Sequence, residues 1–415
     1  MATASHPRAA WPRRCGRKTN GRRSAAIKCL LVAFLCFFFF GAGQVLAQSA
    51  FYTVSDEDLH GPPGTLIRQE QIFGGLENAS AYRILYRSTG LDGHIIAVSG
   101  FVVIPDTPFS VPSGRPIVAW AHPTSGLVSR CAPSLARTKF EEVQGLADMI
   151  EHGFVVVATD YPGLGTEGPH PYLVGVSAGR AVLDSVRAVR SMPEAGGGNR
   201  FVAWGHSQGG QAVLFAGLLA MGYASDLELV GIAAAAPATN LATLVADDIN
   251  TTAGRNLAAM TLWSWNRVFD APIDELVLPA ALPIVDQLAQ ECLESFLDLI
   301  ERRDTTRPLQ KAFLKVDDPT QVEPWRGLLL RNTPGAPPRE IPVFLSQGTG
   351  DSIVRPAVTA DYMRSLCVNG NPVQMMVREG VTHAYIALET ARPAVQWMAD
   401  RFAGRPAPSD CEKQP

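Results

Sequence analysis

The chain has 415 residues, of which 47% are hydrophobic and 18% are charged. This length and composition are those of an ordinary globular protein with one large core or two modest ones, and they exclude a disordered or fibrous chain. Eight of the 36 lysines and arginines lie in residues 1–28, so the rest of the chain has 28 cations against 39 acids, a balance that argues against binding to a nucleic-acid backbone.

The N-terminus has the layout of a secretory signal peptide. Residues 1–28 are basic and contain no acid, residues 29–40 are an apolar run that ends in four phenylalanines, and 45–47 is a Val-Leu-Ala ending. We therefore predict a signal peptide over 1–47, cleaved before Gln48, and an exported protein that is secreted or periplasmic. The alternative is an uncleaved membrane anchor, because the apolar stretch is just long enough to span a bilayer.

Export changes how the cysteines are interpreted. Three of the seven leave with the signal peptide, and in an oxidising compartment the other four predict two disulfides, with three pairings open. Free buried thiols are the alternative. None of the four belongs to a Cys-x-x-Cys pair, so we predict no metal site. The four are Cys131, Cys292, Cys367 and Cys411.

Short apolar runs alternate with helical patterns along most of the chain. After a polar lead-in over 48–79, runs rich in β-branched residues predict a series of strands, and apolar residues at helical spacing predict helices between them. Three glycines at 196–198 are expected to break the chain. This alternation indicates an α/β fold, a mostly parallel sheet with helices on both faces. The predicted strands are 81–87, 94–104, 116–121, 154–159, 201–204, 229–236, 342–345 and 373–377, and the predicted helices are 140–152, 175–190 and 208–221.

The stretch 240–339 interrupts this alternation. It has helical patterns and many prolines but no clear strand, so we predict a helical cap inserted between two late strands. Trp263, Trp265, Phe269 and the apolar series 273–288 either line an acyl-binding surface or form the core of the cap itself. The predicted organisation is a signal peptide (1–47), a first part of the hydrolase core (48–239), the cap (240–339) and a second part of the core (340–415).

The sequence GHSQG at 205–209 marks Ser207 as a candidate nucleophile. A serine hydroxyl needs a base to remove its proton, and α/β-hydrolases place the serine on a sharp strand-to-helix turn, where crowding demands very small residues two positions before and after it. The pattern alone arises by chance, but here it follows the strand at 201–204 and opens the helix at 208–221. That context favours a nucleophile over a plain tight turn.

The acid and the histidine of such a site are expected after late strands, in that order. Asp351 follows the strand at 342–345, and His383 follows the strand at 373–377. We predict that these two residues complete a catalytic triad with the serine. In the alternative interpretations, Asp351 caps a helix that begins near Pro356, and His383 has a structural role.

The oxyanion hole of this fold requires two backbone N–H groups, one from the residue after the nucleophile and one from the loop after an earlier strand. Gln208 supplies the first. The second is expected from HPTSG at 122–126, where Pro123 has no N–H, so Thr124 is preferred over His122 as the donor. The Thr124 hydroxyl is a further candidate contact.

Two other patterns invite a different interpretation. Residues 163–168, GLGTEG, match the dinucleotide-binding pattern Gly-x-Gly-x-x-Gly, but Pro169 and Pro171 stand where the phosphate-binding helix should begin, so we predict no nucleotide binding. Asp160 ends a strand and is a rival acid, but it precedes the serine, and ordering its own loop fits better. Other histidines have no metal-ligand spacing and are expected to be structural or exposed: His94, His152 and His170.

Four stretches resemble the secretory lipase family, the lipase A type of α/β-hydrolase. The resemblance covers most of residues 80–400, and the stretch at 160–175 is more distinctive than the serine motif. It implies a triad of Ser207, Asp351 and His383, a helical cap between the sixth and seventh strands, and hydrolysis of acylglycerol esters. The stretches are AHPTSG with CAPS after it (121–134), DYPGLGTEGPHPYLVG (160–175), GHSQGG (205–210) and TGDSIV (349–354).

The resemblance also bears on two finer points. Related sequences commonly have glycine where this chain has Pro123, so the detailed oxyanion geometry is expected to differ. With the family in view, the preferred disulfide pairing joins Cys131 to Cys292 and Cys367 to Cys411. The first bond would tie the oxyanion loop to the cap, and the second would hold down the C-terminal tail.

These features predict an exported serine carboxylic-ester hydrolase, most specifically a triacylglycerol lipase that works through an acyl-enzyme without a metal or organic cofactor. The expected partners are a lipid or other ester substrate and, transiently, a lipid interface, with no nucleic acid; the oligomeric state stays open. The first alternative is an esterase of short-chain, aromatic or polymeric esters. The second, from a different class, is a catalytically inactive envelope or binding protein on the same scaffold.

Overall fold

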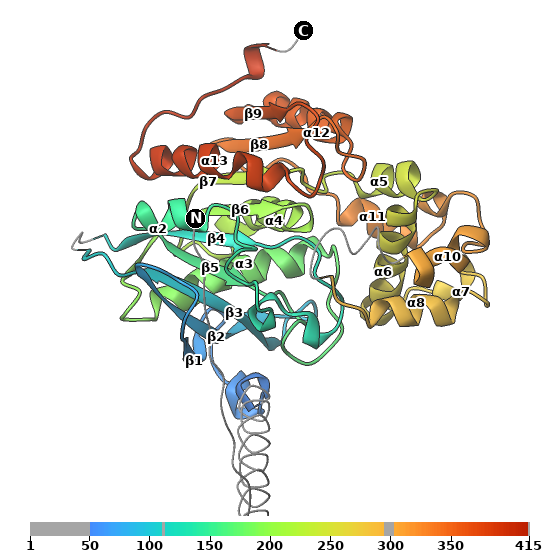
Figure 1. Cartoon of the computed structure of the whole chain (residues 1–415), viewed down its shortest axis with the longest axis horizontal. Coiled ribbons are helices and arrows are strands. Elements are labelled where there is room, and N and C mark those ends of the chain that lie inside the picture. Colours follow the sequence, from blue (N-terminus) through green and yellow to red (C-terminus); the bar gives the residue numbers. More distant parts are fainter. Residues whose placement is uncertain (1–49, 110–112, 294–302, 414–415) are drawn as a thin grey trace, which may run out of the picture. The chain divides into compact units, whose positions relative to one another are not determined.

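One mixed sheet runs through the part of the chain that the computed structural model describes, residues 50–109, 113–293 and 303–413. The predicted signal peptide lies outside the described residues. Across the sheet the strands follow the order β1-β2-β3-β5-β4-β6-β7-β8-β9 (Figure 1). Their bounds are β1 (Leu66–Ile72), β2 (Ala79–Thr89), β3 (Ile95–Pro105), β4 (Arg115–Ala121), β5 (Val155–Thr159), β6 (Gly197–His206), β7 (Glu228–Ala235), β8 (Val343–Gly348) and β9 (Val373–Arg378).

The direction of pairing changes at β5. The pairs β1–β2, β2–β3 and β3–β5 are antiparallel, whereas β5, β4, β6, β7, β8 and β9 form a parallel sheet. Parallel strands need crossover connections that cover both faces, and they therefore appear in the sequence as continuous apolar runs. The run VVVAT in β5 is buried throughout. The mostly parallel α/β sheet predicted from the sequence is confirmed.

Helices cover both faces of this sheet. One apolar core lies against α3 (Gly175–Arg190), α4 (Gln208–Tyr223) and α12 (Pro356–Asn369), and a second lies against α2 (Leu146–Glu151) and α13 (Ile386–Phe402). Within the described ranges, no helix is both long enough and apolar enough to cross a membrane. Short 3-10 helices are η1 (Glu57–Leu59), η2 (Ser129–Cys131), η3 (Pro133–Leu135), η4 (Pro319–Gln321) and η5 (Cys411–Lys413).

The lead-in over 48–79, expected to be without strands, contains the edge strand β1. Its sequence LIRQEQI is mostly polar, and none of its residues is fully buried. An edge strand pairs on one side only and needs little apolar surface, so hydrophobic patterning does not reveal it. Because β1 precedes the predicted strands, the cap that was expected between the sixth and seventh strands lies between β7 and β8.

Glycines account for two other differences from the sequence-based expectation. The helix predicted over 140–152 begins only after Gly145, which has a φ of 84° in the left-handed region that glycine tolerates and helices cannot use. The glycines at 196–198 were expected to break the chain, but β6 begins at Gly197. A Cβ on Gly198 would lie 2.2 Å from the carbonyl oxygen of Ser113, so glycine here permits a close approach of two backbones.

The described residues of 240–339, the predicted cap, form most of one apolar core, which also includes Leu127, Tyr172 and Val174. Trp263, Trp265 and much of the series 273–288 lie in it, together with Trp325, while Phe269 packs at its edge. Of the two expectations for these residues, a core role therefore describes most of them. The cap helices gather beside the sheet in Figure 1: α5 (Leu241–Asp248), α6 (Thr252–Phe269), α7 (Ile273–Leu276), α8 (Leu282–Ala289), α10 (Arg303–Lys311) and α11 (Trp325–Arg331).

The structure contains both disulfides of the preferred pairing. Cys131, in η2, is bonded to Cys292, just after α8, and the next residue, Leu293, donates its N–H to the carbonyl of Ser125 at 2.8 Å. The cap is thus fixed to the loop that follows β4. Cys411 is bonded to Cys367 in α12, and so attaches the C-terminal tail to the core.

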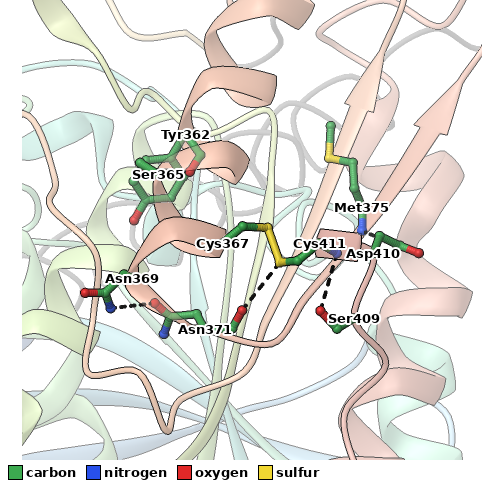
Figure 2. The surroundings of a disulfide bond; sticks show 9 residues. All are labelled: Tyr362, Ser365, Cys367, Asn369, Asn371, Met375, Ser409, Asp410 and Cys411. Atoms are coloured by element: carbon green, nitrogen blue, oxygen red, sulfur yellow. Dashed lines mark hydrogen bonds between the residues drawn. A yellow bond between two sulfur atoms is a disulfide. The ribbon is translucent and has the colours of Figure 1, made fainter. Parts of the chain in front are cut away.

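The tail disulfide is expected to contribute measurably to stability. It joins positions 44 residues apart, and the tail is also held by hydrogen bonds, including one from the Met375 N–H to Asp410 (Figure 2). Replacing both Cys367 and Cys411 with serine is predicted to lower the free energy of unfolding by about 2–4 kcal/mol, because the unfolded chain gains freedom. Urea denaturation measures this. Ser409→Ala, which removes only one hydrogen-bonding hydroxyl, is the control, and an unchanged unfolding midpoint in the double variant would contradict the prediction.

Candidate active site

Ser207 stands on a sharp turn between β6 and α4. Its backbone has φ 57° and ψ −116°, a conformation that non-glycine residues rarely adopt and that costs on the order of 1–3 kcal/mol. Its N–H donates to the carbonyl of Ala235 in β7 at 2.9 Å, which fixes the turn to the neighbouring strand. The turn is as crowded as the sequence predicts: a Cβ on Gly205 would lie 2.3 Å from the Gly209 carbonyl oxygen, and one on Gly209 would lie 1.9 Å from that of Ala121.

The structure brings Ser207, His383 and Asp351 into one chain of hydrogen bonds. His383 Nε2 lies 2.8 Å from Ser207 Oγ, and His383 Nδ1 lies 2.7 Å from Asp351 Oδ2. Ser207 follows β6, Asp351 follows β8 and His383 follows β9. Because these strands are parallel, their carboxyl ends share one edge of the sheet. A carboxylate only accepts hydrogen bonds, so the imidazole proton sits on Nδ1 and Nε2 can take the proton of the serine.

Asp351 is held in its charged form. Burial would raise the pKa of its carboxyl, but the charge and hydrogen bond of His383, with the N–H groups of Ile353 and Val354 at 2.9 Å each, lower it below the usual value. The carboxylate therefore orients His383 and remains ionised at neutral pH. The alternative role as a helix cap does not apply, since the residue that caps α12 is Arg355.

The two residues predicted for the oxyanion hole lie beside the serine. Gln208 is the first residue of α4, whose N–H groups in the first turn have no partner within the helix. Thr124 follows β4, and it lines the same cavity as Ser207 and Gln208. The Thr124 hydroxyl, the other candidate contact, lies 2.9 Å from the hydroxyl of Tyr172.

His206 is a site residue that sequence reasoning did not single out. Its ring packs against that of His383, with 4.9 Å between centroids. Burial, with a smaller effect of the neighbouring His383, lowers the pKa of His206 to about 3, so this ring is neutral at physiological pH. The only available signal in the sequence was its place directly before the nucleophile.

The rival acid Asp160 lies apart from this chain of hydrogen bonds. It is fully buried and accepts hydrogen bonds from Ser99 Oγ at 2.6 Å and from the Ser134 N–H at 2.8 Å, so it orders the loops around it. Burial raises its pKa to about 6. In the dinucleotide-like pattern, a Cβ on Gly163 would meet the backbone of His170 at 2.6 Å, and the next helix begins only at Gly175. The glycines therefore serve a tight loop.

An apolar cavity opens from Ser207 into the cap. The free space in and around it is about 720 Å³, part of which is open to solvent. A second apolar cavity inside the cap shares four of its lining residues, so the two adjoin. The shared residues are Val245, Ala258, Thr261 and Leu329.

Among the described residues that line the first cavity, Asp248 is the one with a charged side chain. It ends α5, and it pairs with Arg355 of the core, whose Nη2 lies 3.2 Å from its Oδ1. Burial raises the pKa of Asp248 to about 6, and the nearby carboxylates of Asp247 and Asp351 add to this, against the opposing effect of Arg355. The ion pair therefore does not offset the desolvation of this carboxylate.

Comparison with known proteins places these observations in a family. The secretory lipase family model matches residues 135–410. A secreted triacylglycerol lipase of Malassezia globosa is 24% identical over 369 residues, which cover 80% of this chain and 73% of that protein. The crystal structure of Candida antarctica lipase A covers 87% of each chain with a TM-score of 0.72 at 18% identity. The rice cell wall degrading esterase of Xanthomonas oryzae covers 83% of this chain and 99% of its own, with a TM-score of 0.68 at 19% identity.

The raised pKa of Asp248 predicts a pH-dependent stability. In the unfolded chain an aspartate ionises near pH 4, whereas Asp248 in the folded protein ionises at about pH 6. The folded state therefore binds the carboxyl proton more tightly, and the stability that this proton contributes is lost as the pH rises from about 4 to about 6. Asp248→Asn, which mimics the protonated form, is expected to raise the free energy of unfolding by roughly 1–2 kcal/mol at pH 8 and by almost nothing at pH 4.

Urea denaturation at the two pH values measures this difference. Asp247→Asn is a matched control, because Asp247 is a neighbouring carboxylate of α5 that pairs with the same guanidinium but is 36% exposed and does not line the cavity. Its effect at pH 8 is expected to stay below about 0.5 kcal/mol. An equal loss of stability in both variants at pH 8 would refute the desolvation argument.

Proposed function

The chain belongs to the secretory lipase family, and from that premise we propose that it is an exported triacylglycerol lipase in which Ser207 forms an acyl-enzyme. That it is a carboxylic-ester hydrolase follows from the family. The observation that carries the finer proposal is the chain of hydrogen bonds from Ser207 through His383 to Asp351, at 2.8 and 2.7 Å. An intact chain of this kind argues against an inactive protein on the same scaffold.

In the proposed mechanism His383 acts first as a base and then as an acid. Its Nε2 takes the proton of Ser207 as the oxygen attacks the ester carbonyl, and the imidazolium is stabilised by the charged Asp351. The N–H groups of Gln208 and Thr124 donate to the developing oxyanion, assisted by the positive end of α4. His383 then gives its proton to the departing alcohol, activates a water molecule, and the acid is released.

The cavity supports a lipid substrate. Its wall beyond Ser207 is formed largely by aliphatic side chains of α5 and α6, including Leu244, Val245 and Leu257, which match an acyl chain better than a polar group. The adjoining cavity in the cap extends the apolar space. We therefore place the acyl chain against the cap and the ester carbonyl at Ser207.

The proposal includes export after removal of the signal peptide at 1–47. Two disulfides support an oxidising compartment, since such bonds rarely persist in a reducing one. The related protein of Malassezia globosa is named as secreted.

The nucleophile is tested by covalent labelling with a fluorophosphonate probe. The wild-type protein is expected to be labelled stoichiometrically, and Ser207→Ala is expected to lose all labelling and to reduce esterase kcat by at least about 10³-fold. Ser352→Ala, a change at an exposed serine next to Asp351, should be labelled like the wild type. Labelling that persists in Ser207→Ala would remove this serine from the proposal, and a wild-type protein that is never labelled would support the inactive alternative.

The substrate class is tested with p-nitrophenyl esters of increasing chain length beside an emulsified triglyceride. Long-chain esters and the triglyceride are expected to be hydrolysed, and Ala258→Leu, which adds side-chain volume where the two cavities adjoin, should shift the preference toward short chains by about tenfold in relative kcat/KM. Ala242→Leu adds the same volume to α5 outside the cavity walls and serves as the control.

Exclusive hydrolysis of short soluble esters would contradict the lipase assignment and leave the ester hydrolase. Release of acids from an insoluble polyester or from plant cell-wall material, without action on triglyceride, would favour the polymeric-ester alternative, the kind of activity named for the Xanthomonas oryzae esterase.

A further inference from the structure

We propose that His170 and Tyr172 are positioning residues of the oxyanion hole, which hold Gln208 and Thr124 in place and join both to the cap. The proposal rests on the function proposed above, in which these two residues donate to the oxyanion. His170 and Tyr172 lie in the strap, the segment 160–175 between β5 and α3. Because the strap matches no catalytic motif, the sequence assigned its histidine only a structural or exposed role.

The side chain of Gln208 is fixed by His170. Gln208 Nε2 lies 2.8 Å from His170 Nε2, and His170 Nδ1 lies 2.9 Å from the carbonyl oxygen of Pro162. A carbonyl only accepts, so Nδ1 carries the proton and Nε2 accepts from the amide of Gln208. The residue whose N–H is aimed at the oxyanion is therefore held at both its backbone, in α4, and its side chain.

This bond requires a neutral imidazole, and the environment of His170 supplies one. The ring is buried between aromatic neighbours, and burial lowers its pKa to about 3, with the Pro162 carbonyl opposing the shift and His122 adding to it. The ring of His170 is therefore neutral at physiological pH, and its contact with Gln208 is not lost by protonation there.

The strap also fixes the other oxyanion residue. The Tyr172 hydroxyl lies 2.9 Å from Thr124 Oγ1, and Tyr172 is 2% exposed. Burial raises its pKa to about 12, so the phenol keeps its proton. Two hydroxyls that share one hydrogen bond leave one proton free, and both Thr124 and Tyr172 line the cavity with Ser207.

A column of aromatic rings connects these two contacts. His122 packs on Tyr161 with 4.4 Å between ring centroids, Tyr161 stacks on His170 at 5.7 Å, and His170 meets Tyr172 at 6.1 Å. The Tyr161 hydroxyl donates to the carbonyl of His122 at 3.0 Å. The loop that carries Thr124 is thus supported at its start by the same rings that hold Gln208.

The cap bonds to the strap at the same place. Ser264 in α6 donates from its hydroxyl to the carbonyl of His170 at 2.7 Å and accepts from the Tyr172 N–H at 3.0 Å, and Trp265 Nε1 donates to the Tyr172 carbonyl at 2.8 Å. The same helix lines the substrate cavity through Leu257. One short segment therefore contacts the acyl-binding cap on one side and both oxyanion residues on the other.

The test compares His170→Met, which keeps the bulk but removes the acceptor, with Gln208→Met, which keeps the backbone N–H but removes the amide. Each is expected to lower kcat by about 10- to 100-fold with KM within twofold, since a misplaced donor weakens only the transition state. The double variant should lose no more than either single one, because both changes break one contact. His170→Gln, whose amide oxygen can accept from Gln208, should recover most of the activity.

A readout that a merely structural role would not move is the affinity for a tetrahedral inhibitor, such as a trifluoromethyl ketone. This affinity should fall in proportion to kcat/KM in both single variants. The control variant is His152→Met, a change at an exposed histidine. The fraction of protein labelled by the fluorophosphonate and the thermal unfolding midpoint of the single variants should stay near those of this control. Losses that multiply in the double variant, or an unchanged inhibitor affinity, would overturn the proposal. If instead the wild-type protein is not labelled and hydrolyses no ester, the proposed function itself fails.

Discussion

The backbone of Ser207 is the constraint on which the rest of the site depends. A serine at φ 57° and ψ −116° persists only where the surroundings leave it no alternative. The N–H of Ser207 donates to the carbonyl of Ala235 in β7 at 2.9 Å, and the carbonyl of Ser207 accepts from the N–H of Gln211 in α4 at 3.1 Å. The strand and the helix therefore hold Ser207 from both sides. Glycine at 205 lets the turn close against the backbone of Gly209, and glycine at 209 lets it lie against the backbone of Ala121 at the end of β4. The buried parallel sheet behind the turn supplies the rigidity that keeps the hydroxyl within reach of His383.

Around this turn, the protein keeps Asp351 charged and several histidine rings neutral. His122, His170 and His206 are buried, and burial is the main reason that their pKa values fall to about 4, 3 and 3. Asp351 differs, because its hydrogen bonds and the nearby His383 outweigh burial and keep its pKa low. In the proposed mechanism, the positive charge that forms on His383 faces the carboxylate of Asp351, and the oxyanion faces N–H dipoles that need no reorganisation.

The sequence could predict those features of the fold and of the site that depend on a local pattern of residues. Buried parallel strands are apolar runs, and the turn at Ser207 needs glycines at fixed spacing, so the core sheet, that turn and the positions of Asp351 and His383 after late strands were within reach. Contacts between distant segments were not. The hydrogen bond between Gln208 and His170 joins residues 38 positions apart, and no local pattern marks it. The role of Asp248 likewise depends on burial by the folded cap, which periodicity on α5 does not reveal.

The cap is not held equally at all of its edges. At the end of α8 it is joined to the loop after β4 by a covalent bond, Cys131–Cys292, and in α6 Ser264 donates to and accepts from the strap backbone. At the end of α5 the link to the core is an ion pair between Asp248 and Arg355, in which desolvation of the carboxylate outweighs the attraction. Separating Asp248 from Arg355 returns a charge to water. Separating the other two links would break a disulfide or leave buried polar groups without hydrogen bonds. Of these three links, the one at α5, where the wall of the cavity meets the loop that carries Asp351, is therefore the least stabilising.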